Sequence, residues 1–289
     1  MVRTRESSTS TPSVPPRGER GWWRRLVGIF LVAFIVYGWL AYGLLPWLWK
    51  HYEHQPNLEP APKTSVTAEG IPGDPLNVAL AGTQTEVVRA MLAADWMPAD
   101  PITFGTSVRI VKSTLLHRSY PTAPVSHLYL WGRRQDMAFE QQAGSSAARR
   151  HHVRFWKAEY FAADGRPFWL GCATFDRGVG LSHWTGKVTH HIDADLDQER
   201  DRLMSDLRQA GQLAQTFQVT GIGPTLWSRN GNGDRYFTDG ELNVGVLVTN
   251  NLKRLEPPVE LANPGNVTLK NKIWSWLRRL RVPDPMEKE

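Results

Sequence analysis

The stretch LVGIFLVAFIVYGWLAYGLLPWLW, Leu26–Trp49, contains no charged side chain. As an α-helix it would be roughly 36 Å long, somewhat more than the ~30 Å hydrocarbon layer of a bilayer. Tryptophans mark both ends, at Trp22, Trp23, Trp47 and Trp49, where amphipathic rings suit the headgroup region. The stretch therefore predicts one transmembrane helix, with the lipid bilayer as its partner.

The residues around this span predict its orientation. A secretory signal peptide would have a shorter apolar core and a small-residue cleavage site, whereas this core runs directly into Lys50. Basic residues gather before the span, at Arg17, Arg20, Arg24 and Arg25. Between the span and residue 75, the only Lys or Arg residues are Lys50 and Lys63. Because cytoplasmic flanks are rich in Lys and Arg, we expect a cytoplasmic N-terminus and an extracytoplasmic C-terminal part at the inner (plasma) membrane.

The net charge of +6 lies at the two ends of the chain. Residues 1–25 hold six Arg and two Glu, and residues 270–289 hold six basic and three acidic residues. The remaining 22 basic and 23 acidic residues nearly cancel. Nucleic-acid binding needs a basic surface on the folded part, so the sequence predicts no nucleic-acid partner.

Composition divides the chain into five parts. Residues 1–25, rich in Ser, Pro and Arg, are expected to form a disordered basic cytoplasmic tail before the span at 26–49. Five prolines between residues 50 and 75 predict an extended tether. Residues 76–250 suit a single domain, and 251–289 form a C-terminal extension. A single cysteine, Cys172, excludes an intrachain disulfide.

Periodicity in the domain predicts an α+β fold with a mostly antiparallel sheet and two to three packed helices. Helical spacing or end signals appear at Thr83–Ala94, Ser107–His117 and Asp195–Gln209. Strand patterns cover residues 76–81, 125–131, 137–141, 152–159, 168–176, 217–222 and 242–248. Strands that follow one another without regular βαβ alternation favour α+β over a doubly wound sheet.

Several sequence blocks resemble the C-terminal domain of LssY proteins. They are Asp74–Leu80, Tyr120–Ser126, Gly132–Glu140, Arg150–Trp156 and Thr189–Asp193. The resemblance covers roughly residues 74–248. It implies membrane association, because this domain occurs behind a membrane anchor or beside multi-pass membrane domains. It implies no particular activity or catalytic residue.

Two histidine pairs, His151–His152 and His190–His191, are the clearest candidates for a metal or catalytic site. In a strand, His152, Arg154 and Trp156 would share one face, and His151 would point to the other. Imidazole and carboxylate groups are ligands for Zn or Mn, which makes His152, His191 and Asp193 a candidate metal site. The alternative is that these histidines make ordinary hydrogen bonds, because their spacing matches no metal-binding motif. The sequence therefore predicts no cofactor, with a divalent metal as the alternative.

A second candidate site would bind an anion. Arg154, Asp176, Arg177 and Lys187 could clamp a phosphate, with Asp176 as acid or base. This set supports a metal- or phosphate-dependent hydrolase as the alternative function. The preferred interpretation is an accessory or binding module at the cell envelope, with a membrane-protein or envelope partner. The sequence does not decide between these two functions, so it leaves open whether the chain is an enzyme.

The C-terminal extension contains a basic amphipathic pattern at residues 270–282. Ile273, Trp276, Leu277 and Leu280 recur at helical spacing among Lys and Arg residues. Such a helix is too short and too charged to span a bilayer. It would either lie on an anionic membrane surface or pack its apolar side on the domain.

Overall fold

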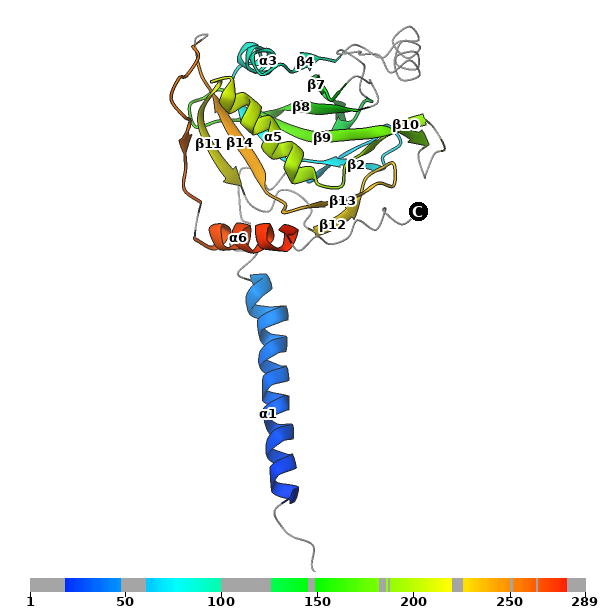
Figure 1. Ribbon diagram of the computed structural model, residues 1–289, viewed down its shortest axis with the longest axis vertical. Coiled ribbons are helices and arrows are strands. Elements are labelled where there is room, and N and C mark those ends of the chain that lie inside the picture. Colours follow the sequence, from blue (N-terminus) through cyan, green and yellow to red (C-terminus); the bar gives the residue numbers. More distant parts are fainter. Residues whose placement is uncertain are drawn as a thin grey trace, which may run out of the picture. The chain divides into compact units, whose positions relative to one another are not determined.

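The computed structural model describes residues 19–47, 61–99, 126–144, 149–181, 186, 188–219, 226–249, 252–263 and 265–279. The chain divides into two compact units, Met1–Tyr52 and Glu53–Glu289. The first contains a long apolar helix and the second an α+β domain, which confirms the predicted fold class (Figure 1). The predicted helix Ser107–His117 lies outside the described residues.

The N-terminal unit is a helix of membrane-spanning length. It comprises α1 (Glu19–Trp39), the π-helical turn η1 (Leu40–Leu44) and helical residues up to Trp47. In η1 the Leu45 N–H donates to the Leu40 carbonyl, five residues back. The nearby Pro46 has no N–H and crowds the carbonyl four residues before it, which accounts for the wider turn.

The helix begins before the apolar stretch. A disordered tail was predicted for residues 1–25, but residues 19–25 are helical, so the prediction is wrong for these residues. Residues 1–18 lie outside the described residues. A helix that starts in the headgroup zone can satisfy its first N–H groups with water, which a helix starting in hydrocarbon cannot do. This explains why the charged residues before the span continue the helix.

The domain is built on a nine-stranded sheet whose centre is the long antiparallel pair β8 (Arg150–Phe161) and β9 (Pro167–Leu181). The other strands are β3 (Val78–Ala81), β4 (Met97–Pro98), β7 (Met137–Gln142), β10 (Val188–Ile192), β11 (Leu213–Val219), β14 (Leu242–Leu247) and β15 (Val259–Glu260). Their order is β15-β11-β14-β3-β9-β8-β7-β4, and β10 also pairs with β9. Only the pairs β14–β3 and β11–β15 are parallel among the described strands.

Two smaller sheets complete the strands. One has the order β2-β1-β5-β6 and contains β1 (Thr64–Val66), β2 (Pro72–Pro75), β5 (Tyr129–Leu130) and β6 (Arg133–Arg134). The other is a hairpin of β12 (Leu226–Arg229) and β13 (Arg235–Thr238).

The strands β1 and β2 correct the predicted tether of residues 50–75, whose second half is folded. Prolines are tolerated in β2 because it is an edge strand. The Ser65 hydroxyl also binds both the N–H and the carbonyl of Asp74, at 3.0 and 2.8 Å, and so supports the irregular pairing.

Helices α3 (Gln84–Ala93) and α5 (Leu196–Gln209) follow the predicted end signals. Thr83 and Glu86 form the capping box that the sequence predicts, because each side chain accepts from the other residue's N–H. Asp195 caps α5 by accepting from the Gln198 N–H at 3.1 Å. Gly211 follows α5 with φ of 69°, and a Cβ there would lie 2.4 Å from the Arg254 carbonyl oxygen.

Each face of the large sheet has its own apolar core. On one face, Val87 of α3 and Leu203 of α5 belong to the same core as alternate residues of β8, such as Val153 and Phe155. On the opposite face, Trp156 and Leu170 pack with Leu128 and Leu130, at β5, and with Leu76, which follows β2. The sheet is therefore the middle of three layers, with helices on one side and the four-stranded sheet on the other.

Candidate functional site

The candidate site is a group of charged and polar side chains in the core of the domain. Alternation along β8 places Arg150, His152 and Arg154 on the face that carries the four-stranded sheet, as the sequence predicts for His152 and Arg154. Register places polar residues of β7 and β9 opposite them. We call this group the buried polar cluster; it comprises Glu140, Arg150, His152, Thr174 and Asp176, which are at most 3% exposed, and the half-buried His190.

Arg150 holds the two carboxylates of the cluster. Its Nε donates to Asp176 Oδ2 at 3.1 Å, and its Nη1 donates to Glu140 Oε2 at 2.9 Å. All three residues are at most 3% exposed. Such a group is strongly destabilised when one partner is removed, because the remaining charge stays buried without compensation. These three residues therefore link the adjacent strands β7, β8 and β9 through their side chains.

His152 lies between Thr174 and Asp176. Its Nε2 is 2.6 Å from Thr174 Oγ1, and its Nδ1 is 3.3 Å from Asp176 Oδ1. Burial alone would raise the pKa of Asp176, but His152, His190 and Arg150 outweigh it and hold that pKa well below its usual range. Asp176 is accordingly a carboxylate, and the cluster contains at least one permanent negative charge beside imidazole groups.

His190 approaches the same carboxylate from β10. Burial lowers its pKa to about 4, and the positive charge of Arg150 adds to this effect, whereas Asp176 opposes it. Its Nε2 is buried and makes no hydrogen bond to a described residue. His190 is therefore a neutral histidine near pH 7, held in the core beside a charged group.

Arg154 lies on the same face of β8 as Arg150 and His152, but its hydrogen-bond partners are outside the buried polar cluster. Its Nη1 donates to Asp74 Oδ2 at 3.1 Å, and its Nε and Nη2 donate to the Ser126 carbonyl and hydroxyl at 3.0 and 3.1 Å. The neighbouring Cys172 Sγ donates to the Asp74 carbonyl, and burial raises the pKa of this thiol far above its usual value. Arg154 thus fixes β2 to β8, and Cys172 is a core residue.

The structure separates the residues of the predicted metal site. His152 belongs to the buried polar cluster, whereas His191 Nδ1 lies 2.6 Å from Asp234 Oδ1. Asp193 Oδ1 accepts from the Asp195 N–H at the start of α5. Among the residues that the structure describes, no three His, Cys, Asp or Glu side chains are grouped to hold a metal ion. The described geometry gives this metal site no support.

The predicted anion site is only partly assembled. Asp176 lies in the buried polar cluster, and Arg154, beside that cluster, is engaged by Asp74 and Ser126. Arg177 is half-buried at the point where the β9–β10 register shifts. Lys187 lies outside the described residues. The two described arginines therefore have separate surroundings, and no shared phosphate clamp is visible in the part of the chain described.

Each histidine pair divides between two environments. His152 and His190 enter the buried polar cluster. Their neighbours point elsewhere: His151 Nδ1 contacts Glu199 Oε2 of α5 at 2.8 Å, and His191 contacts Asp234. Alternation along β8 predicts the first division. Alternation along β10 accounts for the second in the same way, and the register shift between His191 and Ile192 has no signature in the sequence.

The sequence did not identify Glu140, Arg150 or Thr174 of the cluster, or Asp74, the partner of Arg154. It indicated the pair His190–His191, but only His191 was assigned to the predicted metal site. Polar residues two positions apart on neighbouring strands, such as Arg150 and His152 on β8 and Thr174 and Asp176 on β9, were the available signal, but their pairing becomes visible only with the register. Four of the five sequence blocks that carry the resemblance supply these residues and their neighbours, so those blocks meet around one region of the fold.

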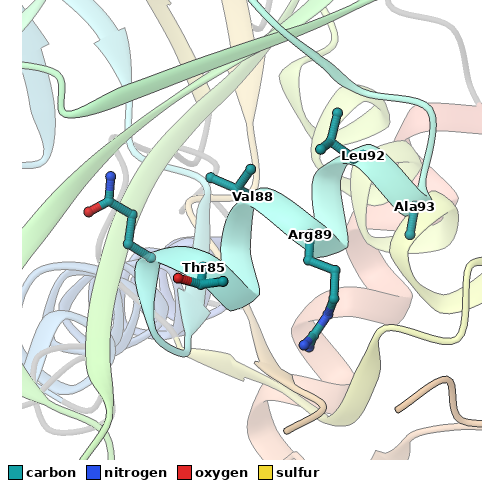
Figure 2. Close-up of a pocket in the computed structure, with 6 residues that line it drawn as sticks. Thr85, Val88, Arg89, Leu92 and Ala93 are labelled. Carbon is teal, nitrogen blue, oxygen red and sulfur yellow. The ribbon is translucent and has the colours of Figure 1, made fainter. Parts of the chain in front are cut away.

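A pocket with a volume of about 700 Å³ lies along the outer face of α3 (Figure 2). It is lined by Gln84, Thr85, Val88, Arg89, Leu92 and Ala93. Its lining comes from this single helix and includes none of the predicted site residues. Arg89 reaches back to donate to the Val248 carbonyl at 2.7 Å. This open pocket and the buried polar cluster are thus separate features of the domain.

The fold and the cluster define a class of protein: an α+β domain with charged residues in its core, carried behind a helix of membrane-spanning length. A family model described as the LssY C-terminus matches residues 56–242, more than half of the chain. The chain belongs to this family, which confirms the resemblance seen in the sequence. Searches of curated proteins and of solved structures found no match.

Proposed function

We propose that this protein is a single-pass membrane protein whose α+β domain acts as an accessory or binding module at the cell envelope. The apolar helix supports this proposal most directly. Residues Gly21–Trp47 have a mean hydropathy of 2.1, and none of their most apolar window is buried inside the structure. A helix of a soluble core would be buried, so this one needs a bilayer to cover its side chains.

The flanking charges support one orientation of the anchor. Four arginines precede the span closely, whereas Lys50 and Lys63 are the only Lys or Arg residues between the span and residue 75. The N-terminus would accordingly be cytoplasmic, and the domain would lie on the extracytoplasmic side of the inner membrane. The near-neutral charge of the domain fits a role that does not involve nucleic acid.

The burial of the polar cluster favours a binding module over an enzyme. A catalytic group must reach its substrate, yet His152 and Asp176 are only 3% and 1% exposed. Their hydrogen bonds and ion pairs run to neighbouring strands of the same sheet. Such contacts support the fold of the domain, whose surface would then contact an envelope partner.

Anchoring is tested by extraction of membranes at alkaline pH. The full chain should stay in the membrane pellet. The double substitution Ile35→Arg and Val36→Arg should release it or prevent its insertion, because two central arginines cost roughly 6 kcal/mol in an inserted helix. The matched control Ile35→Leu and Val36→Leu should stay in the pellet. Extraction of the unaltered chain would contradict the proposal.

A hydrolase is the second candidate function, and one observation favours it. His152 Nδ1, Asp176 Oδ1 and His190 Nε2 are buried near one another, and none has a hydrogen bond to a described residue. A water molecule held by these atoms, or by a metal ion that these side chains would have to rearrange to bind, would be activated for hydrolysis.

Metal analysis of the full chain in lipid nanodiscs separates the two candidates. The binding-module proposal expects no stoichiometric Zn or Mn and no phosphomonoester hydrolysis when either metal is added. Stoichiometric metal that is lost in His152→Ala and in His190→Ala, together with hydrolysis lost in the same variants, would favour the hydrolase. Retained thermal unfolding temperatures in both variants would show that the loss is not caused by unfolding.

A further inference from the structure

The helix α6 (Gly265–Arg279) packs on the domain through a polar stripe. Lys270 Nζ donates to the Asp239 carbonyl at 3.0 Å and forms an ion pair with Glu241. Trp274 Nε1 donates to Asp197 Oδ2 at 3.1 Å. The stripe also contains Asn271, which donates to Gln218 at 2.9 Å, and the buried Val267.

The surface under this stripe is itself a fixed ionic network. Arg200 donates to both carboxylate oxygens of Asp239, at 2.6 and 3.2 Å, and lies 3.4 Å from Asp197. Asp197, Arg200 and Glu241 are at most 2% exposed. Because Lys270 and Trp274 must meet specific oxygens of this network, the rotation of α6 about its own axis is fixed. The polar stripe therefore decides which side of the helix faces away.

The side facing away is apolar. Leu269, Ile273 and Trp276 are 59%, 51% and 59% exposed. At about 100° per residue they lie roughly opposite Val267, Lys270 and Trp274 on the helix circumference. An ordinary surface helix buries its apolar stripe against the domain and exposes its polar one. Here the arrangement is reversed: Ile273 and Trp276 are exposed, which contradicts the alternative in which the helix packs its apolar side on the domain.

We propose that the outward side of α6 lies in the interface of the membrane that the chain itself enters. Thirteen residues separate Trp47 from Ala61, the next described residue, and even fully extended this connection reaches about 50 Å, so the domain must stay within that distance of the bilayer. Lys272, which is exposed on the same helix, would attract anionic headgroups. This inference rests on the proposed anchoring.

Trp276 suits this position in particular. An indole has an apolar body and a polar N–H, and tryptophan is enriched where hydrocarbon meets headgroups. Leu269 and Ile273 would enter the acyl boundary beside it. The domain would then contact the bilayer at two places, through its anchor and through α6, which would orient it on the membrane surface.

The test uses the full chain in nanodiscs that contain phosphatidylglycerol. Ile273→Cys and the matched control Ser275→Cys each receive a nitroxide label; Ser275 is exposed on the flank of the helix. Cys172, the native cysteine, is buried and should stay unlabelled. Accessibility to oxygen, which concentrates in lipid, is compared with accessibility to a water-soluble nickel chelate.

We expect the label at residue 273 to be more accessible to oxygen than to the chelate, and the label at residue 275 to show the reverse order. Equal access of the chelate to both labels would overturn the proposal. A label at residue 273 that both reagents fail to reach, with dipolar broadening between chains, would also overturn it and indicate a second copy as the occupant. Failure of the chain to enter nanodiscs would instead contradict the anchoring.

Discussion

Asp176 is the residue on which the buried polar cluster depends. It accepts from Arg150 and lies beside His152 and His190, and it is 1% exposed. We predict that Asp176→Asn lowers the free energy of unfolding by about 3 kcal/mol, because it leaves a buried guanidinium with one carboxylate partner instead of two. For a domain of this size that corresponds to a decrease of roughly 9 °C in the thermal unfolding temperature, measured on the detergent-solubilised chain.

Asp164→Asn provides the matched control for this substitution. Asp164 also pairs with an arginine, Arg166, but its side chain is 42% exposed. A surface ion pair contributes at most about 1 kcal/mol, so the unfolding temperature should change little. Equal effects of the two substitutions would show that the buried polar cluster does not hold the strands together.

His190 should make the domain sensitive to acid. Its pKa is lowered from 6.5 to about 4, so the unfolded chain binds more protons than the folded chain between these values. Stability is therefore lost as pH falls through this window. Between pH 8 and pH 5 the loss is about 2 kcal/mol from this group. Asp176, whose pKa is also lowered, adds to the loss only at more acidic pH.

We predict that His190→Gln removes most of that loss. Urea unfolding of both proteins at pH 8 and pH 5 measures it, and the difference between the two pH values should shrink by about 2 kcal/mol in the variant. An unchanged difference would mean that His190 is accessible to protons in the folded state.

At the scale of elements, α3 illustrates what the sequence can predict. The capping box of Thr83 and Glu86 is local, and both of its hydrogen bonds are present. Thr83→Ala should lower the free energy of unfolding by about 1 kcal/mol, and Thr83→Ser, which keeps the hydroxyl, should cost much less. Chemical denaturation measures both. A larger effect of the serine substitution would contradict the capping role.

The elements that the sequence did not predict are those without a local sequence pattern, such as alternation or a helix cap. Strands β1 and β2 have three and four residues, and β2 begins and ends with proline. They form because partners distant in the sequence, such as Tyr129 in β5, meet them in the folded chain. By contrast, β8 and β9 were predicted because their alternation and the turn at Gly165 are visible in the sequence.

The candidate site could be predicted only in part for the same reason. Alternation along β8 separates His151 from His152, and the structure confirms it. Which carboxylates meet His152 depends on register, which no local pattern specifies. The sequence therefore indicated the face that carries the cluster but not its members on the neighbouring strands.

The docking of α6 gives a further prediction for an element. Lys270→Met should leave the buried carboxylate of Glu241 without its cation. Because Lys270 is 18% exposed, the cost should be roughly 2 kcal/mol, below that of a fully buried pair. Backbone amides of α6 should then exchange with deuterium faster, as measured by mass spectrometry. Unchanged exchange would show that the polar stripe does not hold the helix.

At the scale of the whole molecule, charge and hydropathy divide the chain into an anchor and a domain. Basic residues lie at both ends of the sequence, and the central part is nearly neutral. This distribution could be identified without a structure, because a long uncharged stretch is unambiguous in composition. The sequence could not predict whether the apolar side of α6 faces the domain or faces away from it, because periodicity shows an apolar stripe but not the surface that the stripe contacts.

The orientation of the anchor is tested most directly by two reporters fused after Glu289. One reporter is an enzyme that is active only outside the cytoplasm, and the other is a protein that fluoresces only inside it. The proposed topology predicts that the first fusion is active and the second is dark, with both chains present in the membrane fraction. If the enzyme fusion is inactive and the fluorescent-protein fusion is bright, the domain lies in the cytoplasm and the proposed topology is contradicted.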